Sequence, residues 1–316
     1  MYIYAGEALA RYGFGEGHPL GPDRFYSFWN AFQESDLVMQ TSIKEPVQGQ
    51  TVDALLFHTA AYVQRVEELS ALGKGMLDAD TPVIPGIFHI ALTVVGTVLD
   101  AVDQIMHGHT EQAFVPIAGL HHASRSTSAG FCVFNDCGIA IEALRQRYAI
   151  RRILYIDIDA HHANGVFYAF EEDPDLLFID THEDGRYLYP GTGSASETGA
   201  GAARGTKLNI PLPPGATDAL FFSNWSRITD FMDRQKPEFI ILQCGADCLA
   251  DDPITHLHLS SQVHLETAKM VSRYAKKHCQ GRVLALGGGG YNKINIASAW
   301  INIIRGFLED QPDDSL

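Results

Sequence analysis

Five short runs of apolar residues, each followed by polar side chains, constrain the fold of this chain more than any other feature. The runs cover residues 113–117, 153–158, 176–179, 239–242 and 283–286, and apart from Pro116 and Asp157 the apolar residues in each run are continuous instead of alternating. Continuous runs are typical of strands that are covered on both faces, as in a parallel sheet with helices on each side. The sequence therefore predicts an α/β fold with a central, mostly parallel sheet.

The segments between the runs have helical periodicity and capping residues. Apolar side chains recur at helical spacing from Ile87 to Val98, which predicts a buried helix. Three further helices are predicted from the residues able to cap them, which are Asn135 or Asp136, Ser260 or Ser261, and Asn295. No internal repeat, low-complexity stretch or linker divides the sequence, so we expect residues 1–316 to form a single domain.

The polar residues that follow two of the runs have the composition of a metal site. Asp159 and His161 come directly after residues 153–158, and Asp247 follows the run that begins at Phe239. Carboxylate and imidazole ligands together suit zinc, and a catalytic zinc site typically has three protein ligands and one open position. Because ligands of parallel sheets gather at the carboxyl ends of the strands, we expect these three side chains to hold one metal ion.

Further candidates for catalysis follow the other runs. Hydrolysis at a metal needs a base and an acid, and the adjacent His121 and His122 can divide these duties. Asp157 and Asn164 are residue types that orient imidazole N–H groups. Tyr291 comes after four glycines and can donate to a developing oxyanion. The alternative interpretation is structural: buried histidines satisfied by the backbone, and a tyrosine that only packs.

Composition excludes several function classes. The net charge of −15 argues against sequence-independent binding of nucleic acid, which needs clustered basic residues. No continuous apolar stretch approaches about 18 residues and the N-terminal residues lack a secretory signal pattern, so we predict a cytoplasmic protein without a membrane segment. Five cysteines in mostly apolar surroundings indicate reduced core thiols; a second metal site at Cys244 and Cys248 is less favoured.

A segment rich in glycine, serine and threonine, residues 185–205, is expected to be a long functional loop. Its Gly199-Ala-Gly201 neither directly follows a predicted strand nor opens a helix, which argues against a dinucleotide-binding fingerprint.

From His18 to Trp300 the sequence resembles the zinc-dependent histone deacetylases, including their bacterial acetoin-utilization-type members. The resemblance rests on motifs that occur in the family's order: HPLGPDR at 18–24, HHA at 121–123, GFCVFND at 130–136, YIDIDAHH at 155–162, YPGTG at 189–193, QCGAD at 243–247 and LGGGGY at 286–291. It implies the arginase/deacetylase-type fold and one zinc ion held by Asp159, His161 and Asp247. It also implies that His122 is the base, that His121 assists electrostatically or as the acid, and that Tyr291 stabilises the oxyanion.

The resemblance further implies how an acylated lysine on a protein or peptide is bound. The residues concerned are Phe131 and Tyr189 as the aromatic walls of a tunnel, Gly130 beside them, Asp80 at the rim, and Arg24 in the region where acetate leaves. A potassium ion is implied near Asp157, Asp180 and Thr181. Asp180 departs from the more usual serine, and Asn164 departs from the aspartate of many members. A neutral partner should stabilise protonated His122 less than a carboxylate would.

Other functions are weighed against lysine deacetylation. Arginase-type ureohydrolases need further carboxylates for a second metal ion, where this chain has Ala163 and Leu249. An inactive acyl-lysine binder is disfavoured because base, metal ligands and phenol are all present. An acetylpolyamine amidohydrolase would need a carboxylate near the tunnel for the ammonium group, and Ile254 stands at the corresponding position. Acyl-chain length, the native substrate and the oligomeric state stay open.

Overall fold

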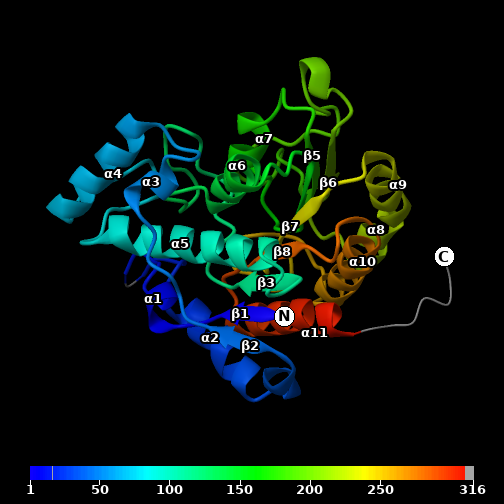
Figure 1. The fold of residues 1–316 in the computed structure, drawn as a ribbon, viewed down its shortest axis with the longest axis horizontal. Coiled ribbons are helices and arrows are strands. Elements are labelled where there is room, and N and C mark those ends of the chain that lie inside the picture. The colour runs from blue at the N-terminus through cyan, green and yellow to red at the C-terminus, as the bar shows by residue number, and fades with distance from the viewer. Residues whose placement is uncertain (16, 310–316) are drawn as a thin grey trace.

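The computed structural model describes residues 1–15 and 17–309, and the strands in this part of the chain form one sheet (Figure 1). The order across the sheet is β2-β1-β3-β8-β7-β4-β5-β6, and each neighbouring pair is parallel. The strands are β1 (Tyr2–Tyr4), β2 (Ser42–Lys44), β3 (Gln112–Val115), β4 (Ile153–Asp157), β5 (Leu176–Glu183), β6 (Lys207–Leu212), β7 (Phe239–Gln243) and β8 (Val283–Leu286).

The five apolar runs are the central strands β3, β4, β5, β7 and β8, and every residue of these strands is buried. The predicted α/β fold with a parallel sheet is confirmed. Strands β1, β2 and β6 were not predicted. β2 and β6 are the edge strands, contain polar residues and are partly exposed, and β1 has only three residues, so the pattern of a long strand buried on both faces is missing there.

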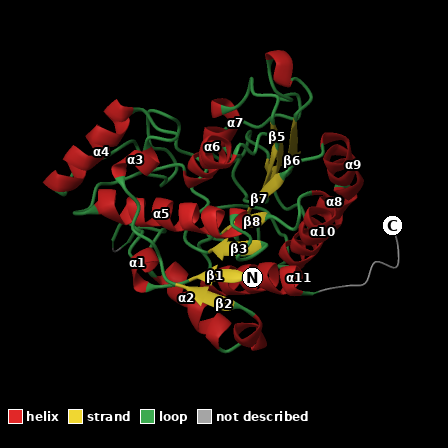
Figure 2. Ribbon diagram, in the orientation of Figure 1, coloured by secondary structure: helices red, strands yellow, loops and turns green. Residues whose placement is uncertain are grey.

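Helices cover both faces of the sheet (Figures 1 and 2). On one face α5 packs on β3, β8 and α6; on the other, α10 packs on β7 and β8, and α11 packs on α10 and α2. The helices are α1 (Glu7–Ala10), α2 (Asp23–Gln33), α3 (Thr51–Ala54), α4 (Ala60–Leu72), α5 (Ile87–Met106), α6 (Asp136–Tyr148), α7 (Asn164–Ala169), α8 (Asp218–Ser223), α9 (Trp225–Gln235), α10 (Gln262–His278) and α11 (Lys293–Leu308), with short 3-10 helices η1 (Asp36–Gln40) and η2 (Gly201–Ala203).

Helix α5 is the predicted buried helix. Among the described helices it alone is long and apolar enough, by length and composition, to cross a membrane. However, 72% of its most apolar window is buried inside the protein, where it packs against the sheet and α6. Its apolar residues are interrupted by Thr93, Gly96 and Thr97, so no continuous apolar stretch is visible in the sequence. The helix therefore belongs to the core, as its helical periodicity indicated.

The predicted helix starts are correct in two cases and wrong in one. Asn135 caps α6, because its side chain accepts a hydrogen bond from Gly138 N–H at 2.8 Å. Ser261 occupies the N-cap position of α10 without a side-chain cap bond. For α11 the cap is Asn292 and not Asn295: the chain is still extended at Asn292, and its side chain accepts from Ile294 N–H at 3.0 Å.

Strand β5 is longer than the apolar run that predicted it. Residues 176–179 were expected to be the strand, with Asp180 and His182 in the segment after it. In the structure β6 pairs in register with β5 as far as Glu183, which pairs with Leu212, and this pairing extends the strand. Asp180 and His182 therefore lie within β5, and both are completely buried.

Candidate active site

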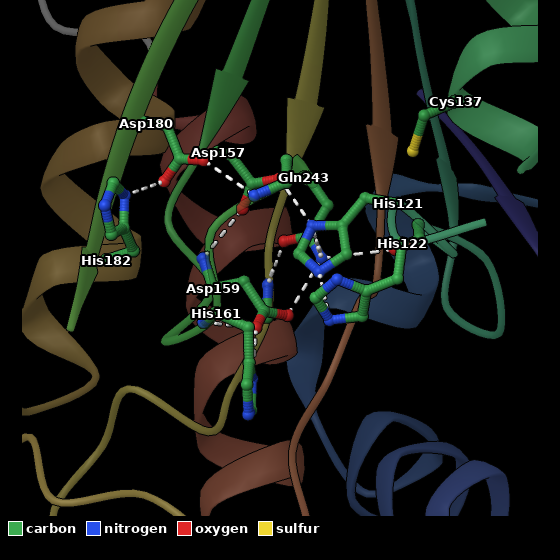
Figure 3. Close-up of polar contacts among 12 residues, drawn as sticks. His121, His122, Cys137, Asp157, Asp159, His161, Asp180, His182 and Gln243 are labelled. Atoms are coloured by element: carbon green, nitrogen blue, oxygen red, sulfur yellow. Dashed lines mark hydrogen bonds and ion pairs between the residues drawn. The ribbon is translucent and has the colours of Figure 1, made fainter. Parts of the chain in front are cut away.

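Asp159, His161 and Asp247 come together at the carboxyl ends of β4 and β7 (Figure 3 labels the first two). All three are buried, and one potential ligand atom from each lies within 4.8 Å of the others. His161 Nδ1 is 3.1 Å from Asp159 Oδ1 and 3.2 Å from Asp247 Oδ2. Two ligands of one tetrahedral zinc ion, with bonds of about 2.0–2.1 Å, are separated by roughly 3.3 Å. The spacing therefore fits a single divalent cation.

The other carboxylate oxygens of this cluster already have donors. Asp159 Oδ2 accepts from Gln243 Nε2 at 2.9 Å and from Gly289 N–H at 2.8 Å. Asp247 Oδ1 accepts from Ala160 N–H at 2.9 Å. One oxygen of each aspartate is thus fixed by the protein. The other faces His161 Nδ1, and that of Asp159 also accepts from His161 N–H at 2.9 Å, which leaves lone pairs on both for a cation.

The electrostatics of the cluster also favour a cation. Burial works against a charged His161, but Asp159 and Asp247 outweigh burial and raise the pKa of the imidazole to about 10. Burial, together with the charge of Asp159, raises the pKa of Asp247 to about 7. Two buried carboxylates favour positive charge at this position, and a divalent metal ion could supply it.

His121 and His122 lie side by side next to the metal cluster (Figure 3), and their Nε2 atoms are 3.1 Å apart. Each ring has a partner at Nδ1: Asp157 Oδ2 at 2.8 Å for His121, and Asn164 Oδ1 at 2.7 Å for His122. Asp157 and Asn164 thus lie where the predicted orienting roles would need them.

The two histidines differ in charge. Burial and the charges of His121 and His161 hold the pKa of His122 well below its usual range. Burial acts on His121 in the same direction, but Asp157 and Asp159 outweigh it and raise its pKa to about 9. His122 is therefore neutral at pH 7. Because its Nδ1–H donates to Asn164, its Nε2 carries the lone pair; this nitrogen faces protonated His121 at 3.1 Å and is the position at which the ring can accept a proton.

Tyr291 lies on the glycine-rich loop after β8, and this loop is held from two sides. Tyr291 N–H donates to Asp252 Oδ2 at 2.8 Å. Arg24 is buried and donates from Nε to Gly290 O at 2.8 Å and from Nη2 to Gly288 O. Burial raises the pKa of Tyr291 well above its usual range, so the phenol keeps its proton. Arg24 thus fixes the backbone of the loop that carries the phenol. No described contact tests its predicted role in acetate release.

A small cavity connects these groups. Its lining consists of Leu20, Gly119, Leu120, His121, His122, Gly130, Cys132, Asp159, His161, Asp247, Gly288, Gly289 and Tyr291. The three candidate metal ligands, both histidines and the phenol therefore face one space. This is the arrangement that hydrolysis of a bound amide requires: a metal site, a base and an oxyanion donor around one reacting carbon.

The predicted tunnel residues border this site to different degrees. The Phe131 ring centroid is 6.2 Å from that of Tyr291, and the Tyr189 centroid is 5.2 Å from that of His122. The segment 185–205 thus reaches the site through Tyr189. Asp80 is half-buried beside Asp78, and burial with this neighbouring carboxylate raises the pKa of Asp80. Ile254 is half-buried, donates its N–H to Asp252 and does not line the cavity.

Gly130 is required by its closeness to His122. A Cβ atom at this position would lie 2.3 Å from His122 Cδ2, far inside van der Waals contact. The backbone φ of 54° is also in the left-handed region that favours glycine. Any larger residue would therefore displace the imidazole.

The residues implied for potassium are adjacent in the sheet, where Asp157 pairs with Asp180. Thr181 Oγ1 is 3.3 Å from Asp157 O. Asp180 Oδ1 is 2.7 Å from His182 Nδ1, a contact drawn in Figure 3, and its Oδ2 accepts from Ala163 N–H at 2.9 Å. Both carboxylate oxygens of Asp180 thus already have one partner, which leaves each with one lone pair for a cation.

Several residues of the site had no predicted role. Gln243 ends β7 and donates a hydrogen bond to Asp159. Its position as a polar residue at the end of a buried strand could have indicated a role in the site. Tyr155 donates to Asp157 Oδ2 at 2.6 Å from inside β4, where it looked like another core residue. Asp252 follows no strand, so the sequence pattern gave no reason to connect it with Tyr291. The five cysteines are all free and buried, as predicted.

Comparison with known proteins identifies the family. The model of the histone deacetylase domain matches residues 18–307. This chain belongs to the histone deacetylase family. The predicted family resemblance is confirmed, and the protein is a hydrolase of the deacetylase type that acts on acylated substrates.

Relatives in other organisms agree with this assignment, and a solved structure shows the same fold. Acetoin utilization protein AcuC of Bacillus subtilis (strain 168) is 34% identical and aligns with 96% of this chain and 80% of its own length. A probable deacetylase of Archaeoglobus fulgidus is 37% identical over 78% of this chain and 68% of its own. The histone deacetylase-like amidohydrolase of Pseudomonas aeruginosa is 29% identical, and the alignment covers 92% of this chain and 76% of the amidohydrolase. The crystal structure of the HDA15 HD domain has the same fold, with a TM-score of 0.87, 22% identity, and coverage of 98% of this chain and 91% of that one.

Proposed function

We propose that this protein is a zinc-dependent lysine deacetylase that hydrolyses N-ε-acetyl-lysine in proteins or peptides to lysine and acetate. One observation carries the proposal: the Asp159–His161–Asp247 cluster, the neutral His122 and the protonated Tyr291 line the same cavity.

The metal ligands and the base have separate duties. Asp159, His161 and Asp247 would hold the zinc ion, which would supply Lewis acidity to polarise an amide carbonyl and make water a better nucleophile. His122 Nε2 accepts the proton of the attacking water, and Asn164 fixes the tautomer that leaves this nitrogen free. His121, paired with Asp157, contributes positive charge next to His122 and is the candidate acid for the leaving amine.

Tyr291 acts on the acyl oxygen. As water adds to the acetyl carbon, negative charge develops on that oxygen, and the phenol O–H donates a hydrogen bond to it. The C–N bond then breaks, the lysine nitrogen takes a proton from the histidine pair, and acetate is released. Asp252 and Arg24 support this step by fixing the two ends of the peptide bond between Gly290 and Tyr291.

The aromatic side chains support a lysine substrate. Phe131 lies near Tyr291 and Tyr189 lies near His122, and both aromatic side chains suit the unbranched stem of an acyl-lysine. Gly130 keeps this approach free of a side chain. We assign Asp80 to the rim, where its carboxylate accepts substrate backbone N–H groups, and Arg24 to the region through which acetate leaves.

We also propose a potassium ion beside the zinc loop, bound by Asp157, Asp180 and the Thr181 backbone. The free lone pairs on Asp180 and the long hydrogen bond to Asp157 O support it. Such an ion would stabilise the protein, and the test is thermal unfolding in matched KCl and LiCl. Equal unfolding temperatures in the two salts would contradict the site.

The proposed reaction is tested with metal-stripped protein before and after zinc is restored. The substrate panel contains acetyl-lysine, lactoyl-lysine and crotonyl-lysine peptides and acetylated polyamines. We expect zinc to restore turnover of acetyl-lysine peptides and little turnover of polyamines, because the apolar Ile254 cannot balance an ammonium group. Preference for polyamines or for longer acyl groups would replace the acetyl-lysine assignment with that amidohydrolase. Binding of acyl-lysine without any turnover would indicate an inactive binder.

A further inference from the structure

The turn that presents Phe131 has a backbone conformation that L residues rarely adopt. Cys132 N–H donates to Ala129 O at 2.9 Å, which closes a tight turn over residues 129–132. φ is 54° at Gly130 and 66° at Phe131. Positive φ at both central positions is typical of the mirror-image turn that favours Asn-Gly sequences. Gly130 adopts it without strain. Phe131 has a large side chain, so surrounding groups must hold its backbone in place.

The hydroxyl of Tyr12 holds this turn from the other side. Tyr12 lies far from the turn in sequence, and its hydroxyl donates to Phe131 O at 2.9 Å. The hydroxyl oxygen of Tyr12 also accepts a hydrogen bond from Val133 N–H at 3.0 Å. One side chain therefore joins the carbonyl of the strained residue to the amide two residues later. Burial raises the pKa of Tyr12 well above its usual range, so the hydroxyl stays a donor.

The conformation of the turn decides where the Phe131 ring lies. The ring packs edge-on against His18, with centroids 4.6 Å apart, and faces the Tyr291 ring at 6.2 Å. A change in the backbone at Phe131 would move this ring relative to the phenol. Gly130, in contact with His122, belongs to the same turn, but its closeness to the imidazole restricts its movement.

We propose that Tyr12 is a positioning residue for the substrate stem: its hydroxyl locks the strained turn at Phe131 and so fixes the aromatic wall opposite Tyr291. The inference rests on the proposed function, because it assigns Phe131 to the wall that contacts an unbranched stem. Tyr12 touches neither the metal ligands nor the reacting atoms in any described contact. Its effect should therefore appear in the binding of long ligands and not at the metal.

The test compares two zinc-chelating probes in zinc-loaded protein, so it needs no turnover. Acetohydroxamate has no stem, whereas octanohydroxamate carries an unbranched chain that must pass the wall. With Tyr12→Phe we expect the affinity for octanohydroxamate, measured by calorimetry, to fall about tenfold, the size of one lost hydrogen bond. The affinity for acetohydroxamate should change less than about twofold.

Tyr62→Phe is the matched control. Tyr62 is as buried as Tyr12, with exposed fractions of 3% and 2%, and its hydroxyl donates to Val133 O at 2.6 Å in the same segment. It does not touch the turn at Phe131, so both probe affinities should stay within twofold of the wild type. The proposal is overturned if Tyr12→Phe leaves octanohydroxamate binding unchanged or weakens both probes equally. It is also overturned if Tyr62→Phe reproduces the selective loss.

A double-mutant cycle adds a second measurement. Phe131→Gly removes the wall and the strain together, because glycine tolerates positive φ. In this background Tyr12→Phe should have no further effect on octanohydroxamate binding; a full additional loss would overturn the proposal. These results are independent of acyl-lysine turnover. Failure of the deacetylase assay with normal probe binding would therefore reject the proposed reaction and leave the role of Tyr12 standing.

Discussion

Asn164→Asp tests the proposed function of His122 as the base. Asn164 Oδ1 is 2.7 Å from His122 Nδ1, and the substitution places a negative charge at this position with almost no change in shape. The wild-type imidazole has a pKa well below its usual range because it is buried and lies near His121 and His161. A carboxylate would stabilise the protonated ring, so the pKa of His122 should rise.

The size of the rise follows from the geometry. Two unit charges about 4 Å apart attract by roughly 4 kcal/mol at an effective dielectric constant of about 20, which corresponds to about three pKa units. Burial of the new carboxylate opposes part of this effect. We therefore expect an increase of about one to three units, the usual range for an imidazole or carboxyl group next to an opposite charge.

The assay is the pH dependence of kcat/KM for an acetyl-lysine peptide. Activity requires neutral His122, so the acidic limb of the profile should move to higher pH by about one to three units in Asn164→Asp. Asn164→Ser keeps a neutral acceptor and should leave the limb in place. An acidic limb that stays where it is in Asn164→Asp, or moves to lower pH, would refute the assignment of His122 as the base.

Four further substitutions test other parts of the site and the core. Tyr291→Phe removes only the phenolic hydroxyl and should lower kcat by roughly 10²–10³ in steady-state assays; a loss under tenfold would contradict the donor role. His122→Ala should lower kcat by roughly 10²–10⁴, and near-normal rates would reject it as the base. Asp159→Ala should lose bound zinc, measured by elemental analysis, together with activity; full activity without metal would count against the metal mechanism. Burial lowers the pKa of Lys207 from 10.5 to about 8. Between about pH 8 and 10.5 the unfolded state therefore binds more protons than the folded state. In this pH range the unfolding free energy of the wild type should rise with pH relative to that of Lys207→Met, and equal pH dependence of the two proteins would contradict this.

The part of the fold that the sequence predicted is the part buried on both faces. Strands β4 and β7 are apolar along their length and end in Asp157 and Gln243, so both the strands and the convergence of polar groups at their ends were visible. Strands β1 and β2 gave no such signal, because each has only three residues and β2, at the edge of the sheet, is partly exposed. The length of β5 depended on its pairing with β6, which is not a local property of the chain.

The candidate site shows a similar division. The metal cluster was predictable because Asp159 and His161 are close in sequence and Asp247 follows a similar strand, β7. Contacts between distant residues were not. Nothing in the sequence around Tyr12 indicates that its hydroxyl binds the turn at Phe131. The positive φ of Phe131 occurs together with this tertiary contact, which no local pattern predicts. Local patterns thus identified the reacting groups, and only the packed chain revealed what holds them.

The segment that follows Asp247 ties two sides of the active site together. Asp252 accepts N–H bonds from both Tyr291 and Ile254, and the Thr255 hydroxyl donates to the backbone carbonyl of Asp247. The same few residues thus brace the metal-binding side and the phenol-bearing side. Changing the chain around Ile254 to admit a new substrate would therefore disturb both sides at once, and compensating changes at Asp252 and Thr255 would have to accompany it.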